Sequence, residues 1–401
     1  MSIPHCTKKE HTITQHGQTR VDNYAWLRDK NWKDIVDGEL NFSEPEVLKY
    51  IEAENAYKDS VMSKNKEVEK KVYAELLSRI KEDKEGYPSR DNMYYYFERE
   101  VKGLNYPILC RFKHSENFSS LPVDYDFTKE KKDAEVYFDI NKEAEGEDLY
   151  SFRGNDTNKE NTLFAYMYNL TGSLECTLKV RDLKTGKDLD WQIENSTGSF
   201  IWINNHELYY IERDDQSRGK KIFKIDVNKG PSSKQLVFTK PEEFDSTYMG
   251  IGETTDEKHV MLTLTSGSTQ VTYISEKGSD TFDMFIIGKD DLTYSLDHWN
   301  GDFYILTNDG AEDFKIVKTS ADKSSWGKDN WKPYIAEEKG KCLTELHVYN
   351  DYLVVERKNN ETGLPEIGVT GLKSDPELKI VKMPEAAYSL SFWGGLGLHG
   401  N

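Results

Sequence analysis

The sequence of 401 residues has few cysteines and no long apolar run, and each absence excludes a class of protein. Its four cysteines are scattered, without a Cys-x-x-Cys pair or a metal-like spacing to histidine, so they predict free thiols in a reducing compartment. No apolar stretch approaches the roughly 18 residues of a membrane span, and the N-terminus has no apolar signal-peptide core. We therefore expect a cytoplasmic protein that does not bind membranes.

Positive charge is also scarce. Lys and Arg number 53 against 71 Asp and Glu, which gives a formal net charge of -18. This charge repels nucleic-acid phosphates and anionic lipid, so neither is an expected partner, whereas cationic or neutral ligands fit better. The mean hydropathy of -0.77 would suit a solvated chain, but 24 Tyr, 17 Phe and 8 Trp argue against disorder. We expect a folded protein.

The first 84 residues are predicted to form an N-terminal arm and two α-helices. Apolar residues recur at three- and four-residue steps from Ser43 to Lys84, which is typical of helices. Pro45 sits where a first helical turn tolerates proline. Residues 21–29 have no clear period, and we expect an extended arm there with a short helix at Trp26.

Beyond Pro88 the chain changes to short β-branched and aromatic runs separated by polar turns such as Asn300-Gly301. About 300 residues of this kind could form one sandwich, two sandwiches, or a propeller with blades of roughly 45 residues. The absence of an interrupting helix or linker favours the propeller. Clear predicted strands cover residues 93–100, 106–112, 162–170, 175–183, 199–203, 207–213, 221–227, 259–265, 302–308, 314–319, 346–357 and 378–383.

Several segments then point to a family. Residues 26–29 read WLRD, residues 45–57 read PEVLKYIEAENAY, and residues 75–83 read ELLSRIKED. In this order they resemble the opening of the oligopeptidase B branch of the prolyl oligopeptidase family. The resemblance continues to about residue 390, through residues 106–111, 138–141, 171–186 and 297–308.

The resemblance implies a mainly β fold, a seven-bladed β-propeller preceded by the arm and the two α-helices. In that family a hydrolase domain carries Ser, Asp and His, cleaves short peptides after Arg or Lys, and is covered by the propeller. We therefore divide the chain into residues 1–84, which would pack on a hydrolase domain, residues 85–390, the propeller, and residues 391–401, a tail that does not resemble the family.

The sequence contains no Gly-x-Ser-x-Gly nucleophile elbow, so no catalytic residue is predicted. Gly172-Ser173, Gly198-Ser199 and Gly267-Ser268 are interpreted as turns. The histidines occur singly, without ligand spacing, and are expected at the surface or at strand ends. Residues 139–143 are similar to half of a calcium loop but lack its glycine. No cofactor-binding or metal site is predicted.

Two acidic clusters, residues 82–85 and 143–148, could attract short cationic peptides, although solvated loops are the plainer interpretation. The leading hypothesis is a truncated, oligopeptidase B-like propeller that is inactive alone, its gene cut short near residue 391. One alternative is the gating half of a split peptidase completed by a separate hydrolase chain. The other is a non-enzymatic propeller that binds a protein or peptide.

The arm and helices would expose apolar side chains if no hydrolase domain covered them. We expect mobility or association within the first 80 residues, in contrast to a stable propeller. The side chains expected to be left uncovered are Tyr24, Trp26, Leu27, Val47, Tyr50, Val72 and Leu76.

Overall fold

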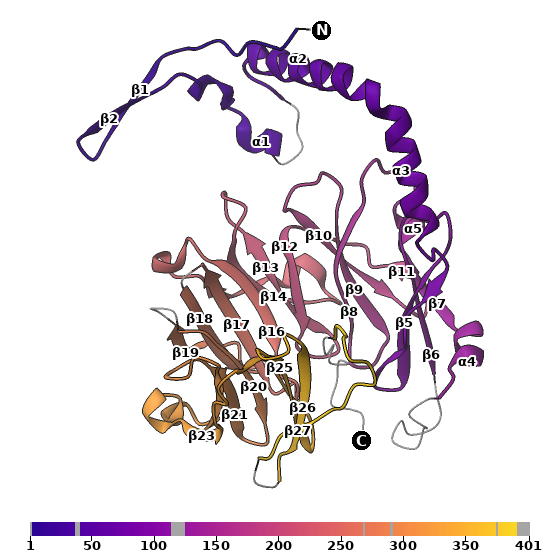
Figure 1. Cartoon of the computed structure of the whole chain (residues 1–401), viewed down its shortest axis with the longest axis vertical. Coiled ribbons are helices and arrows are strands. Elements are labelled where there is room, and N and C mark those ends of the chain that lie inside the picture. The colour runs from indigo at the N-terminus through magenta and orange to yellow at the C-terminus, as the bar shows by residue number, and fades with distance from the viewer. Residues whose placement is uncertain are drawn as a thin grey trace.

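A computed structural model describes residues 2–36, 41–113, 125–267, 269–288, 292–373 and 376–390. Within this part the regular structure is mainly β, and the antiparallel sheets follow one another around a ring, as Figure 1 shows. The predicted mainly β propeller is therefore confirmed. No helix in the described ranges is long and apolar enough to span a membrane.

The arm and helices lie outside the ring, and α2 and α3 arch away from it (Figure 1). Trp26 lies in a short 3-10 helix, as predicted, while a hairpin that was not predicted forms just before it. The bounds are β1 (His11–Gln15), β2 (Gln18–Asp22), the 3-10 helix Ala25–Leu27, α1 (Trp32–Val36), α2 (Pro45–Met62) and α3 (Lys66–Ser78).

The C-terminal end of the predicted helical range is wrong. The helix α3 ends at Ser78. Lys84 begins a short strand, in which it lies opposite Glu100 of the neighbouring strand. Pairing with the first sheet therefore overrides the local helical pattern at this end. The start of α2 is as predicted, with Pro45 in its first turn.

The sheets divide into six blades within the described residues. The first contains β3 (Lys84–Glu85), β4 (Ser89–Asp91), β5 (Tyr94–Glu100), β6 (Ile108–Lys113) and β7 (Glu135–Asp139). The second contains β8 (Ser151–Thr157), β9 (Leu163–Asn169), β10 (Cys176–Asp182) and β11 (Lys187–Asp188). The third contains β12 (Ile193–Trp202), β13 (Glu207–Arg213), β14 (Gly219–Asp226) and β15 (Gln235–Thr239), and β10 pairs with β12.

The remaining three blades are separate four-stranded sheets. The fourth contains β16 (Tyr248–Glu253), β17 (His259–Ser266), β18 (Thr269–Glu276) and β19 (Asp283–Gly288). The fifth contains β20 (Tyr294–Trp299), β21 (Asp302–Thr307), β22 (Lys315–Ser320) and β23 (Lys332–Ile335). The sixth contains β24 (Lys341–Val348), β25 (Tyr352–Asn359), β26 (Pro365–Gly371) and β27 (Lys379–Ile380). The seven blades implied by the resemblance are one more than the described residues form, so that number stays a prediction.

The apolar core lies mainly between neighbouring blades. Strands alternate their side chains between two faces, so each blade presents apolar residues to the blade before it and the blade after it. Between the first and second blades, for example, the rings of Phe138 and Tyr166 lie 4.6 Å apart. Similar buried clusters join blades two and three, three and four, four and five, and five and six. The propeller is thus held together by packing at successive junctions.

Two short helices lie between strands of the first two blades. They are α4 (Thr128–Lys132) and α5 (Ile140–Glu143). The carboxylate of Asp139 caps α5 by accepting a hydrogen bond from the Asn141 amide at 3.1 Å, and Glu143 pairs with Arg181 at 3.0 Å. The stretch that is similar to a calcium loop is therefore a strand end and a capped helical turn whose carboxylates already have partners.

Candidate functional site

The structure places the glycine-serine pairs in different settings. Gly172-Ser173 lies in the turn between β9 and β10, as predicted, and Ser173 is buried among hydrogen bonds from that turn. Gly198-Ser199 lies inside β12, so its interpretation as a turn is wrong. There Gly198 adopts a φ of 87° at a register shift, a conformation that favours glycine. Ser268 lies outside the described residues.

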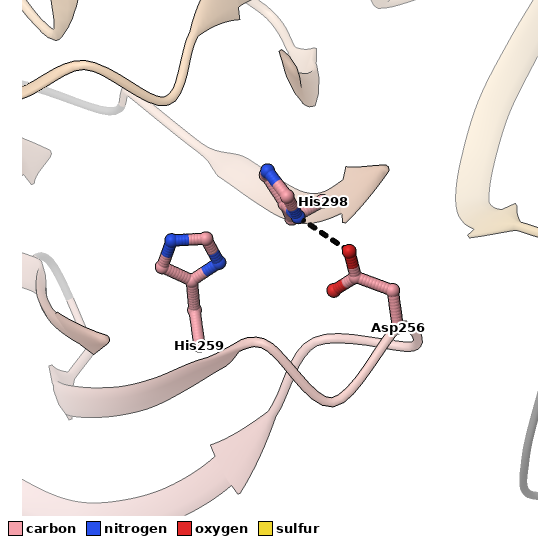
Figure 2. Close-up of side chains that lie close together, drawn as sticks. All are labelled: Asp256, His259 and His298. Atoms are coloured by element: carbon pink, nitrogen blue, oxygen red, sulfur yellow. Dashed lines mark hydrogen bonds and ion pairs between the residues drawn. The ribbon is translucent and has the colours of Figure 1, made fainter. Parts of the chain in front are cut away.

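Asp256, His259 and His298 form a side-chain cluster at the junction of blades four and five (Figure 2). Asp256 belongs to the turn before β17, His259 begins β17, and His298 lies in β20. The Nδ1 atom of His298 lies 2.7 Å from Asp256 Oδ2 and donates a hydrogen bond to it. The two imidazole centroids are 4.3 Å apart in an edge-to-face arrangement. The expected strand-end position fits both histidines, since His259 begins β17 and His298 is next to the last residue of β20, although His298 is only 2% exposed.

This cluster has ligand atoms within 4.8 Å of one another, and so does a second group made of Glu345, His347 and Glu356. These are the groups in the described part of the chain that could hold a metal ion. In the first group, however, the Asp256 carboxylate already accepts hydrogen bonds from His298, from the Thr254 hydroxyl at 2.9 Å and from the Lys258 amide at 3.3 Å. Asp256, His259 and His298 therefore connect blades four and five through a hydrogen bond and a ring contact, and we call this cluster the clamp.

Asp297, next to His298, extends the clamp to a third blade. Its Oδ1 accepts hydrogen bonds from the amides of Thr255 and His298, both at 2.8 Å. Its Oδ2 accepts one from the Val348 amide at 3.3 Å and one from the Thr255 hydroxyl. Since Thr255 precedes β17, Asp297 lies in β20 and Val348 ends β24, one buried carboxylate connects blades four, five and six.

The half-buried imidazole of His259 is expected to make the stability of this junction depend on pH. Burial, reinforced by the neighbouring His298, lowers the pKa of His259 from about 6.5 to about 4. Between these values the unfolded chain binds a proton that the folded chain does not, so the free energy of unfolding falls as pH falls from 6.5 to 4. We expect His259 to contribute about 2–3 kcal/mol to that fall.

Urea unfolding at pH 7 and at pH 4.5 measures this effect. His259→Gln, which keeps a neutral polar side chain, should lose less stability between the two pH values than the original protein. His206→Gln, at an exposed turn position, serves as the matched control and should behave like the original protein. Equal losses for all three proteins would contradict the assignment.

Some carboxylates of the acidic clusters proposed to attract cationic peptides are paired within the protein itself. In the first cluster, Glu82 pairs with Lys102 at 3.3 Å and Glu85 with Arg99 at 2.7 Å. In the second, Glu143 pairs with Arg181 at 3.0 Å. Attraction of cationic peptides by these clusters stays a prediction, and their internal ion pairs weaken the case for it.

A pocket of about 450 Å³ lies where strands of blades two, three and four converge. Its lining comes from β8, β12 and β16 and from the starts of β10 and β14 with the turns before them, and it contains no Asp or Glu. Arg153 and Arg218 both contribute to the lining. A second cavity of about 430 Å³ contains Arg111, but that guanidinium is paired with Glu135 at 2.9 Å. The meeting of Arg153 and Arg218 in the first pocket could not be predicted from the sequence, because the two residues come from different blades.

Comparison with known proteins accounts for the architecture. Residues 4–393 match the family model described as the N-terminal β-propeller domain of prolyl oligopeptidase. The chain is 30% identical over 396 residues to dipeptidyl aminopeptidase BI of Pseudoxanthomonas mexicana, covering 96% of this chain and 52% of that protein. It is 25% identical over 397 residues to protease 2 of Moraxella lacunata, covering 98% of this chain and 53% of that protein.

Solved structures show the same fold. Oligopeptidase B from Leishmania major superposes with a TM-score of 0.81 at 20% identity, over 97% of this chain and 54% of that one. The chain thus spans about half the length of the relatives it matches. The family match extends over nearly all of the sequence, and the six blades provide the architecture that the family description names. The chain belongs to the prolyl oligopeptidase family, of which it contains the N-terminal β-propeller domain.

Proposed function

We propose that this chain is the access-restricting propeller of an oligopeptidase B-like serine peptidase and has no peptidase activity alone. The observation that carries the proposal is the uncovered apolar surface of α3. None of its residues is buried, and Val68, Val72 and Leu76 are exposed by 62%, 50% and 57%. A helix with apolar residues at three- and four-residue spacing normally packs that side against another element. A hydrolase domain is the partner that the family membership suggests.

The proposed substrates are short peptides cleaved after Arg or Lys. Support comes from the resemblance of residues 26–29, 45–57 and 75–83 to oligopeptidase B, and from the fold shared with oligopeptidase B of Leishmania major. We place the reaction in the cytoplasm, because the four cysteines are free and two of them are buried. Inactivity of the chain alone is supported by the absence of a Gly-x-Ser-x-Gly elbow from the sequence.

The surface expected to be uncovered is smaller than the sequence suggested. Val47 is 2% exposed, so its predicted exposure is wrong. The ring of Trp26 lies 6.3 Å from that of Tyr50 in an edge-to-face contact. The arm thus covers the first turns of α2. Exposed apolar side chains remain on α3, at Tyr24 in the arm, and along α2 at Leu48, Ile51, Val61 and Met62.

A cleavage assay tests the proposal. The purified chain alone should not hydrolyse a short fluorogenic peptide that ends in Arg. The same assay is repeated after co-production with the polypeptide encoded directly downstream. Cleavage only in the mixture would identify the chain as the gating half of a two-chain enzyme, whereas no cleavage in either sample supports an inactive propeller. Cleavage by the chain alone would overturn the proposal.

A further inference from the structure

The pocket between blades two, three and four holds two arginines without carboxylate partners. The guanidinium groups of Arg153 and Arg218 form no ion pair or hydrogen bond within the described part of the chain. Arg111, Arg181 and Arg357, by contrast, each pair with a carboxylate at 3.0 Å or less. Two guanidinium groups that line one concave surface and are not bonded to a carboxylate are suited to binding an anion.

A buried hydroxyl in the same lining supports this assignment independently. The Oγ1 atom of Thr197 is buried and has no hydrogen-bond partner in the described structure. A buried polar atom left unpaired costs free energy, which a ligand atom could recover. The hydroxyls of Ser199 and Ser217 line the same space. An ionised carboxylate is an acceptor without donors, so it complements guanidinium and hydroxyl groups that have protons to donate.

The rest of the lining is apolar. Leu174 and Tyr248 are exposed by 63% and 68%, and Met249 completes this side of the pocket. The volume of about 450 Å³ lies within the range typical of small-ligand sites and is too small for a folded protein. The pocket therefore combines an anion-binding side with a surface that an aliphatic or aromatic side chain could cover.

The pocket lies beside the first strands of three consecutive blades. Three of its wall strands, β8, β12 and β16, are each the first strand of their blade.

We propose that this pocket binds the C-terminal carboxylate of a short peptide, with Arg153 and Arg218 as the charged contacts and Thr197 as a hydrogen-bond donor. The choice of a peptide rests on the proposed function. A free C-terminus lies close to every bond of a short peptide but far from most bonds of a long chain. A carboxylate site on the propeller would therefore favour short peptides because it binds their C-termini. This preference would add to the restriction of access that we propose for the propeller.

Isothermal titration of the full chain at low ionic strength tests the inference. The probe is an N-acetylated pentapeptide of glycine, alanine and a C-terminal leucine, used as the free acid and as the amide. The free acid should bind, and the affinity for the amide should be lower by about 10-fold or more. Arg153→Gln and Arg218→Gln should each weaken binding of the acid by about 10-fold.

Arg79→Gln, at an exposed position directly after α3, is the matched control and should bind like the original protein. Thermal melts confirm that every variant is folded. Equal affinity for acid and amide, unchanged binding by both pocket variants, or no binding of the acid at millimolar concentration would each overturn the inference. The titration needs no hydrolase, so its failure is distinguishable from failure of the cleavage assay.

Discussion

Asp297→Ala should lower the free energy of unfolding by about 3–5 kcal/mol. The substitution leaves the amides of Thr255, His298 and Val348 without their acceptor at the junction of three blades. Burial raises the pKa of Asp297 even though hydrogen bonds to the carboxylate act in the opposite direction. The ionised side chain thus has a desolvation cost of its own, and the expected loss arises mainly from the donors left unpaired.

Urea unfolding at neutral pH measures this loss. Asp297→Asn keeps one acceptor oxygen and should lose less stability than the alanine variant. Asp283→Ala removes a carboxylate whose ion pair with Lys323 is exposed, and it should cost less than about 1 kcal/mol. A loss for Asp297→Ala no larger than that of this control would show that the carboxylate does not hold the blades together.

The chain should self-associate through α3, and Val72→Glu combined with Leu76→Lys should weaken that association by about 100-fold. Both side chains are at least half exposed. Burying an apolar side chain contributes about 1.5–3 kcal/mol, so losing two partly buried contacts corresponds to roughly this change. Sedimentation velocity over a range of concentrations gives the association constant.

Lys71→Glu changes a charge on the same helix without removing an apolar side chain, so it is the control for this experiment. Limited proteolysis adds a second readout, because a poorly packed α3 should be cut before the blades. A monomer at every concentration whose first 80 residues resist the protease would contradict the account of this surface.

Much of the fold follows from local patterns that the sequence displays. The predicted strand at residues 207–213 coincides with β13, in which apolar residues 208–211 are fully buried. A continuous apolar run is typical of a strand covered on both faces, and the central strands of a blade lie between neighbouring blades. The two long helices were recognisable from their periodic apolar residues and from Pro45 at the start of α2.

The first strands of the blades were harder to recognise. Strand β8 reads SFRGNDT and β16 reads YMGIGE, with glycine and polar residues in place of a clear alternation. Most of their side chains are exposed or half-buried, because no neighbouring strand pairs with their inner edge. Neither segment was among the clear predicted strands. Where burial is partial, the hydrophobic pattern that identifies a strand is weak.

The clamp between the blades could not be predicted from one sequence. His259 and His298 lie far apart along the chain, and each looks like an isolated histidine. They meet because β17 and β20 belong to adjacent blades, which is a consequence of ring order. The same reasoning applies to Arg153 and Arg218, whose shared pocket depends on the juxtaposition of blades two and three.

If the proposed function is correct, this chain carries no activated serine. Incubation of the pure chain with a fluorophosphonate probe, followed by mass spectrometry of the intact protein, tests it most directly. An activated serine forms a covalent adduct with such a probe, whereas ordinary surface hydroxyls do not react. We predict an unchanged mass. A stoichiometric adduct on one serine would contradict the account.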